Sequence, residues 1–282
     1  MKRVLKSLTL RRGCSMSNSV FEQIHTYAKY LGLDLDASEI AQVSASQNFS
    51  DAQLHAIESI FSYLRDKKEE NIVATLLRMS RLPTKEPKTF ENFDFSQLHG
   101  KQTEAIKNLP TLSALYSHTN LAFIGPQGVG KTHLAMAYGR ACCEKGMKAY
   151  FLKATELNQK LTEARKRGSE SSCINGLVKP SCLIIDEIGR CVFDKENTRM
   201  FFDVIDRRYN KEGPNTLIIT SNKSPDKWGE YFNEDSTLLC SLDRIFDAAI
   251  VFMIKGNSYR GKHCETIALS AGVPLPTPSA KI

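Results

Sequence analysis

The most informative stretch of this 282-residue chain is Gly125-Pro126-Gln127-Gly128-Val129-Gly130-Lys131-Thr132. It matches the pattern G-x-x-x-x-G-K-[ST], follows an apolar run at 121–124 and leads into a helical pattern that continues to Gly146. Glycines permit backbone conformations that turn successive N–H groups inward around a phosphate chain. Lys131 then places a positive charge near the β and γ oxygens, and the Thr132 hydroxyl can ligate Mg²⁺. We therefore predict that residues 125–132 bind a nucleoside triphosphate; a plain glycine-rich turn is the alternative.

A second apolar run, Leu183-Ile184-Ile185, ends in the acids Asp186 and Glu187, 55 residues after Lys131. An acid at the end of a buried strand can hold Mg²⁺ beside bound phosphates, and we assign this role to Asp186. Glu187 can accept a proton from the attacking water, which is the work of a general base. Asp-Glu at a strand end is common, so the assignment depends on the glycine-rich segment upstream. Together the two motifs predict a hydrolase rather than a small-molecule kinase.

A third apolar run, at 216–219, ends in the polar residues Thr220, Ser221 and Asn222. A side-chain amide at this position can orient the attacking water between the acidic strand and the γ-phosphate. We therefore prefer Asn222 over Thr220 and Ser221. The alternative is a polar strand exit that only satisfies backbone groups.

Five short apolar runs alternate with helical patterns after residue 90, which predicts an α/β fold with a parallel sheet flanked by helices. Each run is continuously apolar, as strands buried on both faces are. The runs are 121–124, 149–152, 182–185, 216–219 and 250–254.

The region before this core has helical periodicity. Apolar stripes run through 20–31, through 54–64 after the capping-box sequence 50–53, and through 72–79. Two prolines, at 83 and 87, then indicate a linker. We predict a basic, disordered extension at 1–15 and a helical N-terminal domain at 16–82. A linker at 83–96 then leads to the α/β domain at 97–265, which is followed by a disordered tail at 266–282.

Composition excludes several classes of protein. Hydrophobic residues make up 41% and charged residues 24%, which is ordinary for a globular chain and unlike a disordered one. No run approaches the roughly 20 apolar residues that cross a bilayer, so we predict no membrane association. The eight cysteines include no C-x-x-C spacing, which favours free thiols in a reducing, cytoplasmic setting. The formal charge is +7, with 38 basic and 31 acidic residues, but the first fifteen residues supply much of it.

Basic residues are concentrated in 131–168, where nine basic residues face three acidic ones. The run Arg165-Lys166-Arg167 precedes Gly168-Ser169-Glu170-Ser171-Ser172, which predicts a helix end followed by a flexible polar loop. Such a loop can neutralise DNA phosphates with little sequence specificity. The alternative is a solvated helix terminus whose cations complement the helix dipole.

Further motifs give the chain a resemblance to the IstB family of insertion-sequence transposition ATPases, covering roughly 85–262. The related DnaC-type helicase loaders share the glycine-rich segment, the acidic strand and the Ser-Tyr-Arg ending. The motifs that carry the resemblance are Asp206-Arg207-Arg208-Tyr209-Asn210, Thr220-Ser221-Asn222-Lys223, Trp228-Gly229-Glu230, Leu242-Asp243-Arg244 and Lys255-Gly256-Asn257-Ser258-Tyr259-Arg260.

The resemblance implies an AAA+ ATPase that uses ATP and Mg²⁺ and acts as an oligomer, with nucleotide at subunit junctions. It implies that Arg244 is an arginine finger acting on a neighbour's nucleotide and that Arg260 is a sensor acting within its own subunit. From position alone, either arginine is an ordinary surface ion-pair partner. The resemblance also implies assembly on DNA and a transposase partner; a replicative helicase is the alternative partner. The cysteines near these motifs, Cys240 and Cys264, depart from the family pattern.

Overall fold

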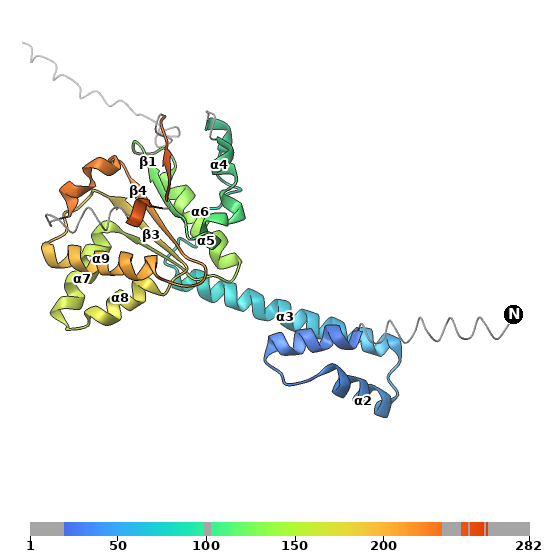
Figure 1. Cartoon of the computed structure of the whole chain (residues 1–282). Coiled ribbons are helices and arrows are strands. Elements are labelled where there is room, and N and C mark those ends of the chain that lie inside the picture. The colour runs from blue at the N-terminus through green and yellow to red at the C-terminus, as the bar shows by residue number, and fades with distance from the viewer. Residues whose placement is uncertain (1–19, 99–102, 233–243, 248, 257, 259–282) are drawn as a thin grey trace, which may run out of the picture.

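The computed structural model describes residues 20–98, 103–232, 244–247, 249–256 and 258. Its centre is one five-stranded sheet in the order β2-β3-β4-β1-β5, in which every neighbouring pair is parallel. Figure 1 shows this sheet between helical layers. The predicted parallel α/β architecture is therefore confirmed. The strands are β1 (Asn120–Ile124), β2 (Ala149–Lys153), β3 (Cys182–Ile188), β4 (Thr216–Ser221) and β5 (Ala249–Met253).

The inner strands are buried on both faces, but the edge strand β5 is not. All of β4 is buried, and in β3 only Glu187 is half-buried. In the described part of the chain β5 pairs with β1 alone, and Ile250 and Met253 are 45% and 56% exposed. The prediction that the run at 250–254 is buried on both faces was wrong. Apolar content does not reveal whether a strand has one neighbour or two.

Helices cover both faces because alternate residues of each strand point to opposite sides. Phe123 and Ile184 pack with helix α6 on one face, and Leu183 and Leu217 pack with α7, α8 and α9 on the other. These helices are α6 (Lys131–Glu144), α7 (Ala154–Lys166), α8 (Glu170–Val178) and α9 (Lys195–Tyr209). The shorter elements are η1 (Phe95–Gln97), α4 (Thr103–Lys107), η2 (Leu109–Thr111), α5 (Ser113–Tyr116) and η3 (Pro225–Tyr231).

The N-terminal region is helical, as predicted. A helix over 20–31 packs with α2 (Ala37–Gln47) and the first half of α3 (Asp51–Met79). Ser50 and Gln53 form the expected capping box at the start of α3. The two stripes at 54–64 and 72–79 belong to this single 29-residue helix rather than to separate helices. The buried residues of the small core are Val20, Ile24, Ile40 and Leu54.

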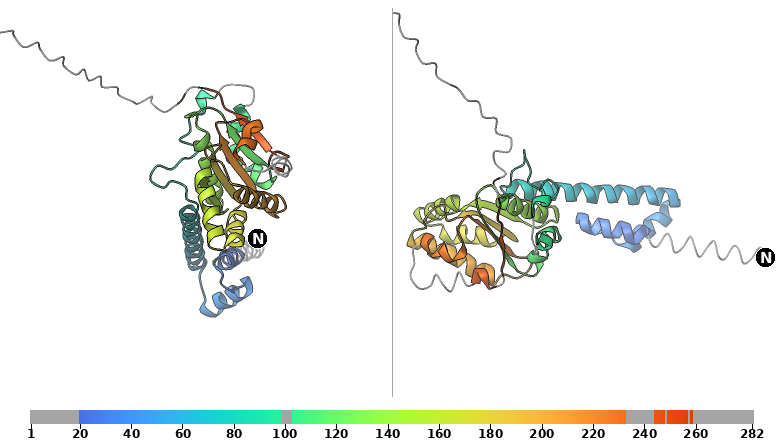
Figure 2. Two further views of the ribbon diagram at one scale, coloured as in Figure 1. Left: turned by 90° about the vertical axis from the view of Figure 1, so that its left-hand side faces the viewer. Right: turned by 90° about the horizontal axis from the view of Figure 1, so that it is seen from above.

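The end of α3 is fixed to the sheet. Leu76 and Leu77 pack against the core on the α6 face, and the Phe151 N–H of β2 donates to the Ser80 carbonyl at 2.8 Å. Figure 2 shows α3 extending from the α/β domain with the other N-terminal helices beside its far half. The domain limits at 82, 83–96 and 97 stay predictions, and residues 1–15 and 266–282 lie outside the described residues. Among the described helices, none combines the length and the apolar character of a membrane span.

Candidate nucleotide-binding and catalytic site

The glycine-rich segment forms the turn from β1 to α6, as its sequence predicts. Gly125 and Gly128 have φ of 155° and 79°, and neither has room for a side chain. A Cβ at Gly125 would lie 2.0 Å from the Ile254 carbonyl oxygen, and one at Gly128 would lie 2.0 Å from the Ser258 hydroxyl. The segment after β5 therefore packs directly on the turn. Only glycine permits both the backbone conformation and this close approach.

Lys131 begins α6 and is almost entirely buried. Its ammonium group donates to the Gly125 carbonyl at 2.8 Å and to the Pro126 carbonyl at 2.6 Å. The lysine thus lies across the turn, where the main chain provides the acceptors that a phosphate would provide in a complex. A phosphate oxygen is a stronger, charged acceptor, so it can replace these two carbonyl groups as the partner of the Lys131 ammonium group.

Asp186 joins two hydroxyl groups at the carboxyl ends of the strands. The Thr132 hydroxyl donates to Asp186 Oδ1 at 2.7 Å, and the Thr220 hydroxyl donates to the same oxygen at 2.5 Å. Asp186 is 2% exposed, and burial raises the pKa of its carboxyl group. The two hydroxyl donors act in the opposite direction and lower that pKa, while the nearby charge of Glu187 raises it further.

Glu187 lies at an irregularity of β3. The β3–β4 register shifts between Ile185 and Ile188, and Glu187 has a φ of 62°, in the left-handed region that residues with side chains seldom adopt. The Glu187 N–H donates to the Thr220 hydroxyl oxygen at 3.0 Å. Its carboxylate accepts from Arg190, with an Nη1–Oε2 distance of 2.5 Å. Strained backbone of this kind costs about 1–3 kcal/mol and is concentrated at functional sites.

A cavity of about 440 Å³ lies at these groups, with the buried Asp186 behind the residues that line it. Lys131 and Thr132 line it from the glycine-rich turn, and Glu187, Thr220 and Asn222 line it from the ends of β3 and β4. We call the set Lys131, Thr132, Asp186, Glu187, Thr220 and Asn222 the catalytic rim. The structure thus brings the predicted phosphate-binding and hydrolytic residues together at one edge of the sheet.

Thr220 is the rim residue whose importance the sequence did not show. Its hydroxyl group contacts both acids, donating to Asp186 and accepting from the Glu187 main chain. The signal was the polar end of the third apolar run, from which only Asn222 was selected. The parallel register is what distinguishes Thr220, because it lies opposite the irregular part of β3, between the pairs Ile185–Ile219 and Ile188–Ser221.

The rim has the donor set of a magnesium site. Mg²⁺ prefers carboxylate, hydroxyl, water and phosphate oxygens, and a typical nucleotide site has only one or two protein carboxylates. Thr132 and Asp186 present such oxygens side by side, and the buried Asp186 carboxylate accepts hydrogen bonds from two hydroxyl groups. A divalent cation fits this chemistry. The described residues hold no cluster of three or more His, Cys, Asp or Glu side chains of the kind that binds a transition metal.

Comparison with known proteins places this site in a family. The sequence matches the model described as IstB-like ATP binding protein over residues 26–266. The chain belongs to the IstB-like family of ATP-binding proteins. Its relatives include the ATP-binding protein of insertion sequence IS5376 from Geobacillus stearothermophilus, 36% identical over 85% of this chain and 94% of that protein. The insertion sequence IS232 ATP-binding protein from Bacillus thuringiensis subsp. berliner is 33% identical, over 88% of this chain and 97% of that protein.

Solved structures show the P-loop AAA+ fold for this IstB-like protein. The replication initiator DnaA bound to AMPPCP and single-stranded DNA aligns with a TM-score of 0.50 and 25% identity, over 63% of this chain and 52% of that chain. DnaI aligns with a TM-score of 0.51 and 18% identity, over 65% of this chain and 93% of that chain.

Of the two arginines that the family resemblance singled out, the structure describes Arg244. Its guanidinium group pairs with the carboxylate of Asp206 in α9. Arg244 also lines a cavity of about 330 Å³ with Asn120 and Asn215, at the amino ends of β1 and β4. The phosphate-binding turn is at the carboxyl ends of the same strands. Arg260 lies outside the described residues.

The basic run at the end of α7 differs from its prediction. α7 ends at Lys166 and α8 begins at Glu170, so the expected flexible loop at 168–172 is wrong: it is a short turn followed by a helix. Arg165 is ion-paired with Asp194 at 2.7 Å, whereas Arg167 is 74% exposed.

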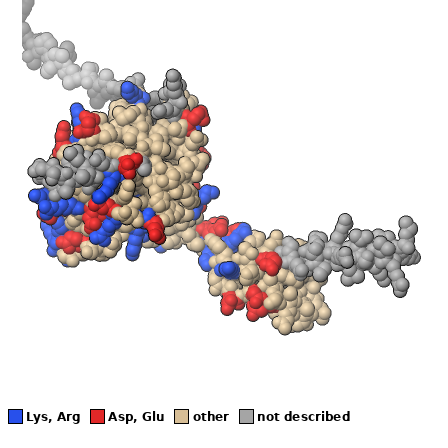
Figure 3. Space-filling model, viewed as in Figure 1, with Lys and Arg blue, Asp and Glu red and all other residues tan. Residues whose placement is uncertain are grey.

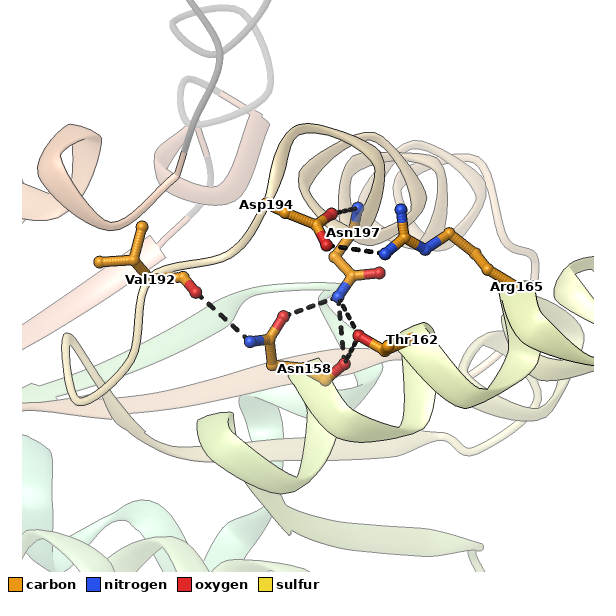
Figure 4. Close-up of polar contacts among 6 residues, drawn as sticks. All are labelled: Asn158, Thr162, Arg165, Val192, Asp194 and Asn197. Carbon is orange, nitrogen blue, oxygen red and sulfur yellow. Dashed lines mark hydrogen bonds and ion pairs between the residues drawn. The ribbon is translucent and has the colours of Figure 1, made fainter.

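Figure 4 shows the contact between Arg165 and Asp194 and the hydrogen bonds around it. Asp194 also caps α9 by accepting from the Asn197 N–H at 2.8 Å, and the Asn197 amide donates to Asn158 and Thr162 of α7. Arg165 thus belongs to a polar network that joins α7 to α9.

Proposed function

We propose that this IstB-like protein hydrolyses ATP with Mg²⁺, assembles on DNA and assists a transposase in moving an insertion sequence. The observation that carries the ATPase assignment is the chain of contacts from Thr132 through Asp186 and Thr220 to Glu187, beside Lys131 in one cavity. The relatives, which are ATP-binding proteins of insertion sequences, support the transposition context. A cytoplasmic location is part of the same proposal, because the cysteine spacing favours free thiols in a reducing setting.

The chemistry assigns one task to each residue of the rim. The main-chain amides of 125–132 surround the phosphates, and Lys131 leaves its two carbonyl acceptors for phosphate oxygens. Thr132 and Asp186 hold Mg²⁺, which neutralises charge on the β- and γ-phosphates when bound. Glu187 accepts a proton from the attacking water, and Asn222 orients that water.

Arg244 is proposed to act across a subunit junction. In its own subunit it lies at the opposite end of the strands from the phosphate-binding turn, so a neighbour's nucleotide is the target its position favours. A guanidinium group suits this task because it remains charged and presents a planar set of donors. Arg260 keeps its proposed role as a sensor within its own subunit.

The DNA part of the proposal is supported by the exposed basic residues at the end of α7. Lys166 and Arg167 remain candidates for phosphate contacts, while Arg165 enters only as the residue that fixes the end of the helix. The DnaA structure that shares this fold was solved with single-stranded DNA, which is a property of that protein. Sequence-independent contact with the DNA backbone is what we expect here.

The test of the ATPase assignment is Glu187→Gln, measured by ATP binding and by phosphate release. Binding should persist, while turnover falls by about 10²-fold or more, the usual contribution of a general base. Equal turnover in wild type and variant would remove Glu187 from the mechanism. Mixing Arg244→Ala with Lys131→Ala subunits should partly restore activity if the arginine acts across a junction. No recovery at any mixing ratio would contradict that arrangement.

The partner is tested separately. In a pull-down assay with ATP and DNA, the immobilised transposase encoded by the same insertion sequence should retain this protein. Capture by the host's replicative helicase instead would favour the helicase-loader alternative, which uses the same ATPase residues.

A further inference from the structure

A second concave surface lies between α7 and α8, on the other face of α7 from Arg165. It encloses about 380 Å³, and we call it the α7–α8 groove. One wall is a single face of α7, with residues spaced three and four apart, and the other is the facing side of α8. The start of β2 and the end of α3 complete it. The lining residues are Met79, Lys148, Tyr150, Lys160, Glu163, Ala164, Arg167, Ser169, Ser172, Cys173 and Gly176.

The charge of this groove is predominantly positive. Lys148, Lys160 and Arg167 face one acid, Glu163. Arg167 is only loosely held by Glu163, at 3.8 Å and with both side chains largely exposed. Within the described part of the chain, neither Lys148 nor Lys160 has a carboxylate within ion-pair distance. Both lysines are nevertheless half-buried. Removing charged groups from water without a partner is unfavourable, so an anion in the groove would relieve that cost.

The side of the groove formed by α8 consists of small residues, some of which carry hydrogen-bond donors. Ser172 contributes a hydroxyl group, whereas the Ser169 hydroxyl already donates to the Ala164 carbonyl at 3.4 Å. Gly176 leaves space, because a Cβ placed there meets no atom within 4 Å. α8 begins at this end of the groove, and its N-cap residue Ser169 makes no side-chain capping bond. The first-turn amides and the positive end of the helix dipole therefore add to the field of the lysines. The groove offers cations, hydroxyl groups and amides, which are the donors that a phosphate group accepts.

We propose that the α7–α8 groove binds a phosphate group of the DNA backbone, with Lys148 and Lys160 as its principal contacts. The inference rests on the proposed function, because it assigns the DNA contact that the function requires. A continuous strand is favoured over a small free anion because Arg167, which lines the groove where α7 ends, has a side chain that is 74% exposed and can contact a further phosphate. Figure 3 shows further Lys and Arg side chains, with acids among them, on the side of the domain that carries α7, α8 and α9.

The first experiment measures DNA affinity against salt concentration, in the presence of a non-hydrolysable ATP analogue. Each phosphate contact contributes about 0.7–0.9 to the slope of log K against log salt. Lys148→Ala/Lys160→Ala should therefore lower the slope by about 1.6 and weaken binding about 40-fold at 0.1 M salt. Lys148→Arg/Lys160→Arg should retain most of the slope. The matched control is Lys29→Ala/Lys107→Ala, which removes two exposed lysines from distant helices.

The second experiment fills the groove without changing its charge. Gly176→Leu places a side chain in the open space on α8, and DNA affinity should fall at least tenfold while the melting temperature and ATP affinity are kept. An unchanged salt slope in the double lysine variant, or an equal fall in the control, overturns the proposal. If the double variant keeps DNA affinity but loses a thermal shift caused by inorganic phosphate, the groove binds a free anion instead. If wild-type protein binds no DNA, the proposed function itself fails; retained wild-type binding with an unaffected double variant defeats the groove alone.

Discussion

The catalytic rim and the α7–α8 groove are both proposed to receive phosphate, but they hold their polar groups differently. In the rim every acidic or basic group described has an internal partner: Lys131 contacts two carbonyls, Asp186 two hydroxyl groups and Glu187 an arginine. In the groove Lys148 and Lys160 are half-buried and have no carboxylate partner within the described ranges. The rim is thus preorganised and closed by its own bonds, whereas the groove keeps its charge available. A phosphate that binds in the rim must therefore replace existing hydrogen bonds of the protein. A phosphate that binds in the groove would form new contacts with the lysines without replacing any ion pair.

The largest expected effect separates the two lysine environments. Lys131→Ala should weaken ATP binding by about 10²-fold, because hydrogen bonds to charged groups are worth about 1.5–3 kcal/mol each. Lys148→Ala should change ATP affinity by less than about twofold. Isothermal titration with Mg²⁺ and ATP measures both. Similar losses in the two variants would mean that the rim and the groove are not separate sites.

The next effect concerns Arg190, the ion-pair partner of the proposed general base Glu187. The Arg190–Glu187 ion pair must open before the carboxylate can accept a proton from water. An exposed pair is worth about 0.2–1 kcal/mol, so Arg190→Ala should raise basal ATP turnover by up to about fivefold. Arg199→Ala is the matched control, since Arg199 pairs with Glu196 at the same spacing on α9. A fall in turnover for Arg190→Ala would show that the arginine assists the reaction instead.

Burial of Asp186 predicts a pH-dependent gain in stability when its charge is removed. Because burial raises its pKa in the folded protein, the folded state binds this proton more tightly than the unfolded state. Its contribution to stability is therefore present at low pH and is lost as the pH rises through the folded-state pKa. Asp186→Asn should raise the metal-free melting temperature at pH 7.5 by about 2–4 °C, or about 1 kcal/mol, and by less at pH 4. A lower melting temperature at pH 7.5 would contradict this.

The smallest effect distinguishes structural from available cations on α7. Arg165→Ala should lower the free energy of unfolding by about 0.5–1 kcal/mol, because its pairing with Asp194 ties α7 to the cap of α9. Lys166→Ala should stay within about 0.5 kcal/mol of wild type, as exposed substitutions usually do. Chemical denaturation of both variants measures the difference. Equal stabilities would return Arg165 to the list of candidate DNA contacts.

These regions also differ in how well the sequence predicted them. The rim was largely predictable, because the glycine-rich turn and the acidic strand are local motifs that a parallel sheet brings to one edge. Thr220 was missed because its role depends on the β3–β4 register, which no local pattern specifies. The ion pair of Arg165 was not predicted, because its partner, Asp194, lies 29 residues further along the chain. The groove was not predicted at all, since Lys148, Lys160 and Gly176 come together only through folding.

The joint between α3 and the sheet has a mechanical consequence. An α-helix rises about 1.5 Å per residue, so the 29 residues of α3 make a rod roughly 43 Å long. Its last turns are packed on the core, and the Ser80 carbonyl is bonded to β2. A rod clamped at one end acts as a lever: a tilt of a few degrees at the sheet moves its far end by several ångströms. A molecule bound to the N-terminal helices would therefore lie at a fixed distance from the sheet. Small rotations of α3 at the sheet would displace that molecule by a larger distance.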